Sequence, residues 1–161
     1  EAWTRSPADI VAYTDVDLST DLAALEKLCR AIWEDGFDLG TGSRLQETSE
    51  TTRGPKREFI SRTYNLLVKL LLGTRFSDAQ CGFKAFTEDA VLKIFPITKI
   101  NYWSFDVEAL GLAKKIGYRI KEIPVVWVND LSSRVKLSSY LKFFLEVFKI
   151  KWWLITNKYN I

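Results

Sequence analysis

The feature that most constrains the fold is an apolar run, residues 10–13, that ends at two aspartates, Asp15 and Asp17. This pattern predicts a buried strand over residues 9–13 with acidic side chains at its carboxyl end, the edge where ligands bind in open α/β sheets. Two carboxylates one residue apart suit Mg²⁺ or Mn²⁺, hard ions that take oxygen ligands. The alternative, that both are solvated loop acids or a helix cap, stays open on this spacing alone.

The composition narrows the chemistry that the chain can perform. Its 161 residues fit one domain, and no apolar stretch has the length of a transmembrane span. Histidine is absent, so chemistry here would depend on carboxylates, arginines and a metal ion. Cys29 and Cys81 lack metal-ligand spacing and are interpreted as reduced thiols.

Charge is distributed unevenly along the chain. Residues 1–50 hold 4 basic and 11 acidic side chains, whereas residues 51–75 and 132–161 each hold 6 basic and 1 acidic. An acidic, metal-binding part facing two basic parts suits a metal-bound phosphate together with a second anion. The acidic first third makes nucleic-acid binding improbable. Simple scatter of charges over solvated faces is the alternative.

The order of expected elements indicates an α/β fold. After the first strand we expect a helix over 22–33, a strand over 37–42 and a mobile polar loop over 45–55. The remaining elements are helices over 55–72 and 88–94, a helix capped by Ser104 or Asp106 that runs to residue 116, an edge or bulged strand over 119–128, a basic loop over 131–136 and a helix over 137–156.

The helix over 55–72 has a polar face near its start. Arg57, Ser61 and Asn65 follow one another at intervals of four and therefore share that face. Because the first turn of a helix already favours negative charge, these residues predict an anion cradle.

Seven motifs occur in an order that resembles the inverting family 2 glycosyltransferases, in the branch of dolichyl-phosphate mannose synthase and dolichyl-phosphate β-glucosyltransferase. The motifs are Asp15-Val16-Asp17 (a DXD motif), Gly42-Ser43-Arg44, Arg57-Glu58-Phe59-Ile60-Ser61, Asp78-Ala79-Gln80-Cys81-Gly82-Phe83-Lys84, Phe105-Asp106-Val107-Glu108, Glu122-Ile123-Pro124-Val125 and Ser132-Ser133-Arg134-Val135-Lys136. The resemblance implies the C-terminal portion of a GT-A fold, a mixed sheet flanked by helices. It also implies a further amino-terminal segment that holds the nucleotide base and ribose.

The resemblance implies a role for each matching residue. Asp15 and Asp17 would hold Mg²⁺ or Mn²⁺ against the donor diphosphate, and Ser19 stands where relatives place a glutamine ligand. The acceptor phosphate would be bound by Arg44, Arg57 and Ser61, and the donor by Asp15, Asp17, Gln80 and Arg134. Asp78 and Gln80 would contact the transferred sugar, and the implied catalytic set is Asp15, Asp17, Arg44 and Asp78.

The implied function is transfer of a hexose from a nucleotide-sugar, UDP-glucose or GDP-mannose, to a polyprenyl phosphate. An acceptor phosphate is already ionised near neutral pH and needs no strong base, which agrees with a chain that lacks histidine. One alternative is a non-catalytic glycosyltransferase-like binding or assembly module. Another alternative is a metal-dependent phosphohydrolase with Asp15 as nucleophile. That mechanism needs a lysine and a further acidic cluster in matching order, which the sequence does not supply convincingly.

The expected organisation is a partial GT-A catalytic domain over 1–136 and an amphipathic helix over 137–161. Aromatic residues alternate with lysines in that helix, which is typical of a membrane interface. We therefore expect a protein on the cytoplasmic side of a membrane, peripheral or anchored by other segments. A helix packed on the domain is the alternative. An open sheet edge would also favour association with a second copy.

Overall fold

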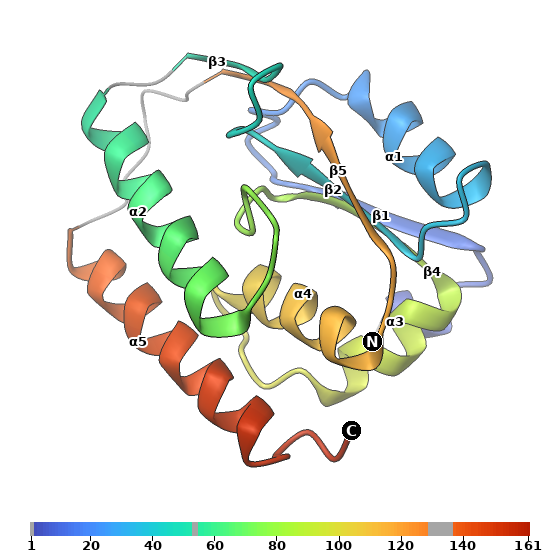
Figure 1. Ribbon diagram of the computed structural model, residues 1–161. Helices are drawn as coiled ribbons and strands as arrows, with labels where there is room; N and C mark the ends of the chain where they lie inside the picture. Colours follow the sequence, from blue (N-terminus) through green and yellow to red (C-terminus); the bar gives the residue numbers. More distant parts are fainter. Residues whose placement is uncertain (1, 53–54, 129–136) are drawn as a thin grey trace.

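The computed structural model describes residues 2–52, 55–128 and 137–161, and its centre is a mixed four-stranded sheet (Figure 1). The strands are β1 (Ile10–Thr14), β4 (Phe83–Thr87), β2 (Leu39–Ser43) and β5 (Ile120–Pro124), in that order across the sheet. β4 runs antiparallel to both of its neighbours, and β2 runs parallel to β5. The expected mixed α/β architecture is confirmed, and β5 is an edge strand, as the sequence predicts.

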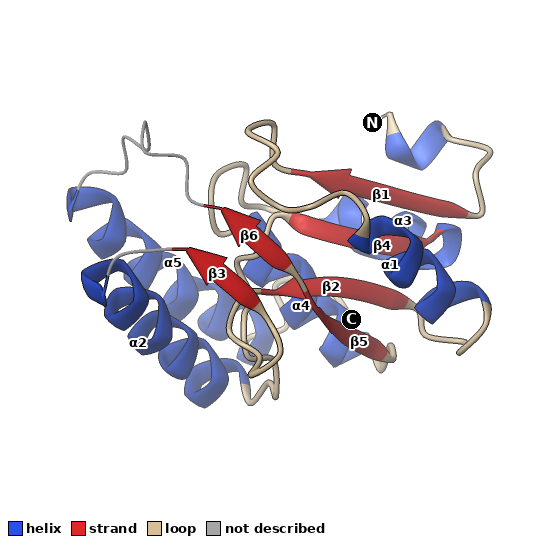
Figure 2. Ribbon diagram, turned by 90° about the horizontal axis from the view of Figure 1, so that it is seen from above, coloured by secondary structure: helices blue, strands red, loops and turns tan. Residues whose placement is uncertain are grey.

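A second, two-stranded sheet extends from β5 (Figure 2). β3 (Glu50–Thr52) pairs in parallel with β6 (Val126–Val128). Two expectations were wrong here: residues 45–55 are not entirely loop, and residues 119–128 form two strands rather than one. The break comes after Pro124, where the backbone N–H of Val125 still donates to the Ser43 carbonyl (3.2 Å) before the chain turns to pair with β3.

Helices cover both faces of the four-stranded sheet. α1 (Ala24–Trp33) packs on one face, and α3 (Glu88–Ile94), a 3-10 turn (Phe95–Ile97) and α4 (Phe105–Ile116) lie on the other (Figure 1). Alternation along β4 explains the two cores, because successive side chains of a strand point to opposite faces. Phe83 and Ala85 join the core under α1, whereas Phe86 joins the core with α4.

α2 (Pro55–Leu72) and α5 (Leu137–Ile155) lie side by side and pack on α4 (Figures 1 and 2). Their inward residues, which include Tyr64, Val68, Phe143, Val147 and Ile150, belong to the same core as α4. In the described part of the chain, every helix falls short of the combination of length and apolarity that crossing a bilayer requires.

Candidate active site

Asp15 and Asp17 lie just beyond the carboxyl end of β1, as the sequence predicts, and both side chains are exposed. The Asp15 backbone N–H donates to the Gly82 carbonyl (2.7 Å), and Asp17 Oδ1 accepts the N–H of Ser19 (3.0 Å). The turn that follows is tied to β6, because the Val128 N–H donates to the Ser19 carbonyl (2.9 Å). The aspartates are therefore carried by a turn that is fixed on two sides.

The surroundings of Asp15 disfavour its negative charge. Although Asp15 is exposed at the surface, neighbouring atoms partly desolvate its carboxylate. This desolvation, the charge of Asp106 and the charge of Asp17 raise the pKa of Asp15, while Arg44 and Lys84 oppose the rise. Gly82 lies directly against the carboxylate: a Cβ on Gly82 would come within 2.1 Å of Asp15 Oδ1. A cation bound at Asp15 and Asp17 would relieve this accumulation of negative charge.

Arg44 follows β2 and makes a two-point ion pair with Asp78. Its Nε and Nη2 donate to the two carboxylate oxygens at 2.6 and 2.9 Å, and its backbone N–H also donates to Asp78 (3.1 Å). The Asp78 side chain is fully buried, and that of Arg44 is 14% exposed. The ring of Trp127 lies 5.7 Å from the guanidinium carbon, so Arg44 is fixed by an anion and an aromatic ring together.

The segment 77–82 separates Asp15 from Arg44 and is itself fixed by other elements. The Glu122 carboxylate accepts the backbone N–H of Ser77 (2.8 Å) and of Asp78 (3.1 Å), as well as the Ser77 hydroxyl (2.8 Å). On the other side, Asn65 Oδ1 accepts the N–H of Ala79 (2.8 Å). β5 and α2 therefore both position this segment.

The remaining expected residues are placed less completely. Ser61 is half-buried on α2, and its carbonyl accepts a hydrogen bond from Asn65 Nδ2 (3.0 Å). Gln80 is half-buried next to Asp78 in segment 77–82. Arg57 falls in the first turn of α2, but its side chain lies outside the described residues, as does the whole of Arg134. Of the expected cradle, Asn65 is buried and engaged with Ala79.

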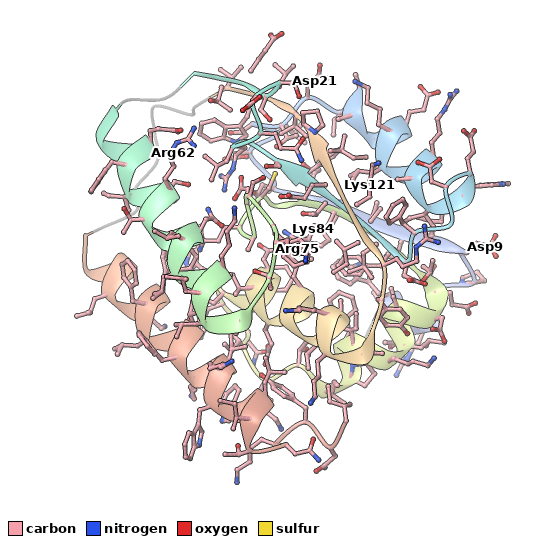
Figure 3. The ribbon with its side chains drawn as sticks, viewed as in Figure 1. Asp9, Asp21, Arg62, Arg75, Lys84 and Lys121 are labelled. Atoms are coloured by element: carbon pink, nitrogen blue, oxygen red, sulfur yellow. The ribbon has the colours of Figure 1, made fainter. Side chains whose placement is uncertain are left out.

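Sequence reasoning did not identify Glu122, Trp127, Tyr13 and Lys84 as parts of the site. Lys84 has no exposed surface and ion-pairs with Asp106 (2.9 Å). Figure 3 labels it near the centre of the view. Glu122 and Lys84 both lie within the motifs quoted above, and that position was the sequence signal that could have identified them. A linear pattern does not tell which motif residues are buried.

Asp15 and Asp17 are the two carboxylates with which this site could bind a metal ion. Across the described residues, His, Cys, Asp and Glu form no group of three or more that could hold a metal. Asp15 and Asp17 fit a hard divalent ion that takes its other ligands from phosphate and water, as Mg²⁺ commonly does.

The architecture matches that of a solved enzyme. Glucosyl-3-phosphoglycerate synthase of Mycobacterium tuberculosis, solved with uridine diphosphate, superposes with a TM-score of 0.61 over 93% of this chain and 50% of that one, at 14% identity. The fold is therefore that of the GT-A-like glycosyltransferases, with a mixed sheet flanked by helices.

Sequence comparison agrees, although no family model matches the chain. Glycosyltransferase AglD of Haloferax volcanii is 34% identical over 160 residues, covering 99% of this chain and 26% of that protein. Dolichyl-phosphate β-glucosyltransferase ALG5A of Trichomonas vaginalis is 32% identical (88% of this chain, 45% of that protein), and the human dolichyl-phosphate β-glucosyltransferase is 30% identical (81% and 42%). The chain is a homologue of these proteins, and the predicted resemblance to dolichyl-phosphate β-glucosyltransferases is confirmed. It spans less than half the length of each of these relatives.

Proposed function

We propose that the protein is an inverting glycosyltransferase that moves a hexose from a nucleotide-sugar to a polyprenyl phosphate. The observation that supports this most strongly is the homology to dolichyl-phosphate β-glucosyltransferases. The geometry agrees, because segment 77–82 is bonded both to Asp15 at the end of β1 and to Arg44 at the end of β2. A UDP-bound relative in fold supports the choice of a nucleotide-sugar donor.

The chemistry follows from the arrangement of charges. Arg44, oriented by Asp78, would bind the acceptor phosphate together with Arg57 and Ser61, so that an oxygen already ionised at neutral pH attacks the sugar without a general base. Attack opposite the leaving group inverts the anomeric carbon. Asp15 and Asp17 would hold Mg²⁺ or Mn²⁺, whose chemistry there is to neutralise charge on the departing diphosphate. Gln80 and Arg134 would contact the donor.

Asp78 would support this reaction by orienting Arg44. Both of its oxygens are engaged with Arg44, and its side chain is fully buried, so in this structure it orients the arginine. Direct contact between Asp78 and the transferred sugar stays a prediction.

A transfer assay tests the proposed function. The full-length protein is incubated with a polyprenyl phosphate and labelled UDP-glucose or GDP-mannose, with and without Mn²⁺. We expect a metal-dependent glycolipid product from one donor and its loss in Asp17→Ala. Absence of product, or full activity of Asp17→Ala, would contradict the proposal, and an inactive protein that binds nucleotide would favour a non-catalytic module instead.

The paired helices α2 and α5 form the surface that we assign to the membrane. Exposed apolar side chains recur along each helix at intervals of three, four or seven residues, as one stripe requires. On α2 they are Phe59, Leu66 and Leu70, and on α5 they are Leu141, Leu145, Phe148, Trp152 and Ile155. Lys142 and Lys149 are exposed on α5. Apolar stripes with adjacent lysines suit the interface of an anionic bilayer, where the acceptor lipid resides.

Liposome co-sedimentation tests this surface with a matched pair of tryptophans. Trp152, 62% exposed on α5, is replaced by alanine, and Trp33, 81% exposed on α1, serves as the control. We expect Trp152→Ala to reduce binding to anionic vesicles and Trp33→Ala to leave it unchanged. Equal behaviour of the two variants would remove the membrane assignment.

A further inference from the structure

Lys84 is a charged residue in the interior that the proposed reaction does not use. It is the second residue of β4 and has no exposed surface, and its Nζ donates to Asp106 Oδ1 (2.9 Å) and to the Cys81 carbonyl (2.5 Å). The same Nζ is 5.9 Å from the centre of the Tyr13 ring. A lysine is almost never fully buried without such partners.

These contacts belong to a closed ring of bonded residues that includes the backbone of Asp15. The Tyr13 hydroxyl donates to Asp106 Oδ1, the same oxygen that accepts from Lys84. Lys84 in turn holds the carbonyl of Cys81, and the carbonyl of the next residue, Gly82, accepts the N–H of Asp15. Asp15 is two residues beyond Tyr13 on the same chain segment, which closes the ring.

The ring determines where Gly82 stands relative to the Asp15 carboxylate. Gly82 Cα lies so close that a Cβ would be 2.1 Å from Oδ1, so a small rotation of the Cys81–Gly82 peptide changes the space available to the carboxylate. Lys84 Nζ donates to the carbonyl oxygen of this peptide. We propose that Lys84 and Asp106 are positioning residues that fix the orientation of the Asp15 carboxylate for its divalent ion; this rests on the proposed function.

A purely electrostatic role for Lys84 predicts the opposite result. A buried cation near a metal site repels the metal, so removing its charge would by itself strengthen metal binding. Loss of positioning would weaken it, because groups that orient a ligand typically contribute tenfold or more to metal affinity. The sign of the change therefore separates the two roles.

The experiment measures Mn²⁺ affinity of the full-length protein by electron paramagnetic resonance, with UDP or GDP present in parallel arms. Lys84→Met is compared with wild type and with Lys93→Met, which removes a lysine from an exposed pair with Asp89 on α3. We expect Lys84→Met to raise the Mn²⁺ dissociation constant about tenfold and Lys93→Met to leave it unchanged. An unchanged or lower dissociation constant in Lys84→Met overturns the proposal.

Two further variants keep the test decisive if Lys84→Met folds poorly. Lys84→Met/Asp106→Asn replaces the ion pair by neutral groups of similar size, which avoids an unpaired buried charge. Tyr13→Phe removes only the hydroxyl that donates to Asp106. Both are expected to weaken Mn²⁺ binding, and wild-type affinity in both overturns the proposal. A wild type that binds Mn²⁺ but transfers no sugar contradicts the proposed function alone, whereas a wild type that binds no Mn²⁺ overturns this inference.

Discussion

Arg44 and Asp78 form a two-point ion pair, with Nε and Nη2 of the arginine 2.6 and 2.9 Å from the two carboxylate oxygens. Breaking a buried pair leaves a charge without its partner, which is more costly than the loss of one contact. We expect Asp78→Asn to lower the free energy of unfolding by about 3 kcal/mol, measured with urea. Asp89→Asn, in an exposed pair with Lys93, is the control and should cost under about 1 kcal/mol. Equal costs would contradict the prediction.

The same pair predicts how stability depends on pH. Burial alone would raise the pKa of Asp78, but the charge and hydrogen bonds of Arg44 outweigh it and lower the pKa to about 2. Because the folded-state pKa lies below the unfolded value of about 3.9, this stabilisation is present above pH ~4 and is lost as the pH falls towards 2. Urea titrations over that range should show a contribution of about 2 kcal/mol that Asp78→Asn lacks. Parallel curves would exclude it.

Gly82→Ala should impair the site while leaving the fold intact. Its Cβ would meet the Asp15 carboxylate at 2.1 Å, and that carboxylate is the end of a flexible side chain that can turn away. We expect sugar transfer to fall about tenfold with a stability change under about 1 kcal/mol.

Gly111→Ala provides the matched control for Gly82→Ala. The nearest atom to its new Cβ is Leu72 Cδ1 at 3.5 Å, which is ordinary contact, and alanine suits the interior of α4. Transfer by this variant should equal that of wild type. Full activity in both glycine variants would show that Gly82 does not constrain Asp15.

Glu122 should stabilise the site through hydrogen bonds to backbone. Glu122→Ala leaves the N–H groups of Ser77 and Asp78 without their acceptor, at an expected cost of about 2 kcal/mol in urea unfolding. Oε1 of Glu122 accepts three of the four hydrogen bonds to Ser77 and Asp78. The Glu122→Gln variant keeps an oxygen that can take the place of Oε1, so this variant should retain most of the stability. Similar losses in the two variants would point to charge rather than hydrogen bonding.

Local signals predicted much of the fold. Pro55 opens α2 and Gly73, with φ +61°, follows its end, because each residue suits one end of a helix. Gly117, with φ +99°, ends α4 in the same way. The helices over 55–72 and 88–94 have the predicted bounds.

Long-range pairing explains what the sequence did not reveal. Glu50–Thr52 is polar and has no apolar alternation. It forms a strand because its backbone pairs with that of β6, which lies 76 positions later in the sequence (126 − 50). Likewise, nothing local shows that Lys84 points inward to Asp106 while Lys93 remains exposed. The expectation for Asp15 and Asp17 depended on a strand end, which is a local signal, whereas the partners of Arg44 and Asp15 come from distant elements.

The parallel pairing of β2 with β5 has a consequence for the order of folding. Leu39 pairs with Ile120, and Glu122 beyond it holds the segment between Asp15 and Arg44. Contacts between residues so distant in sequence form slowly, because a long loop must close before they contribute. During synthesis, therefore, Asp15 and Arg44 leave the ribosome long before their surroundings exist, and the site is completed only once β5 has been made.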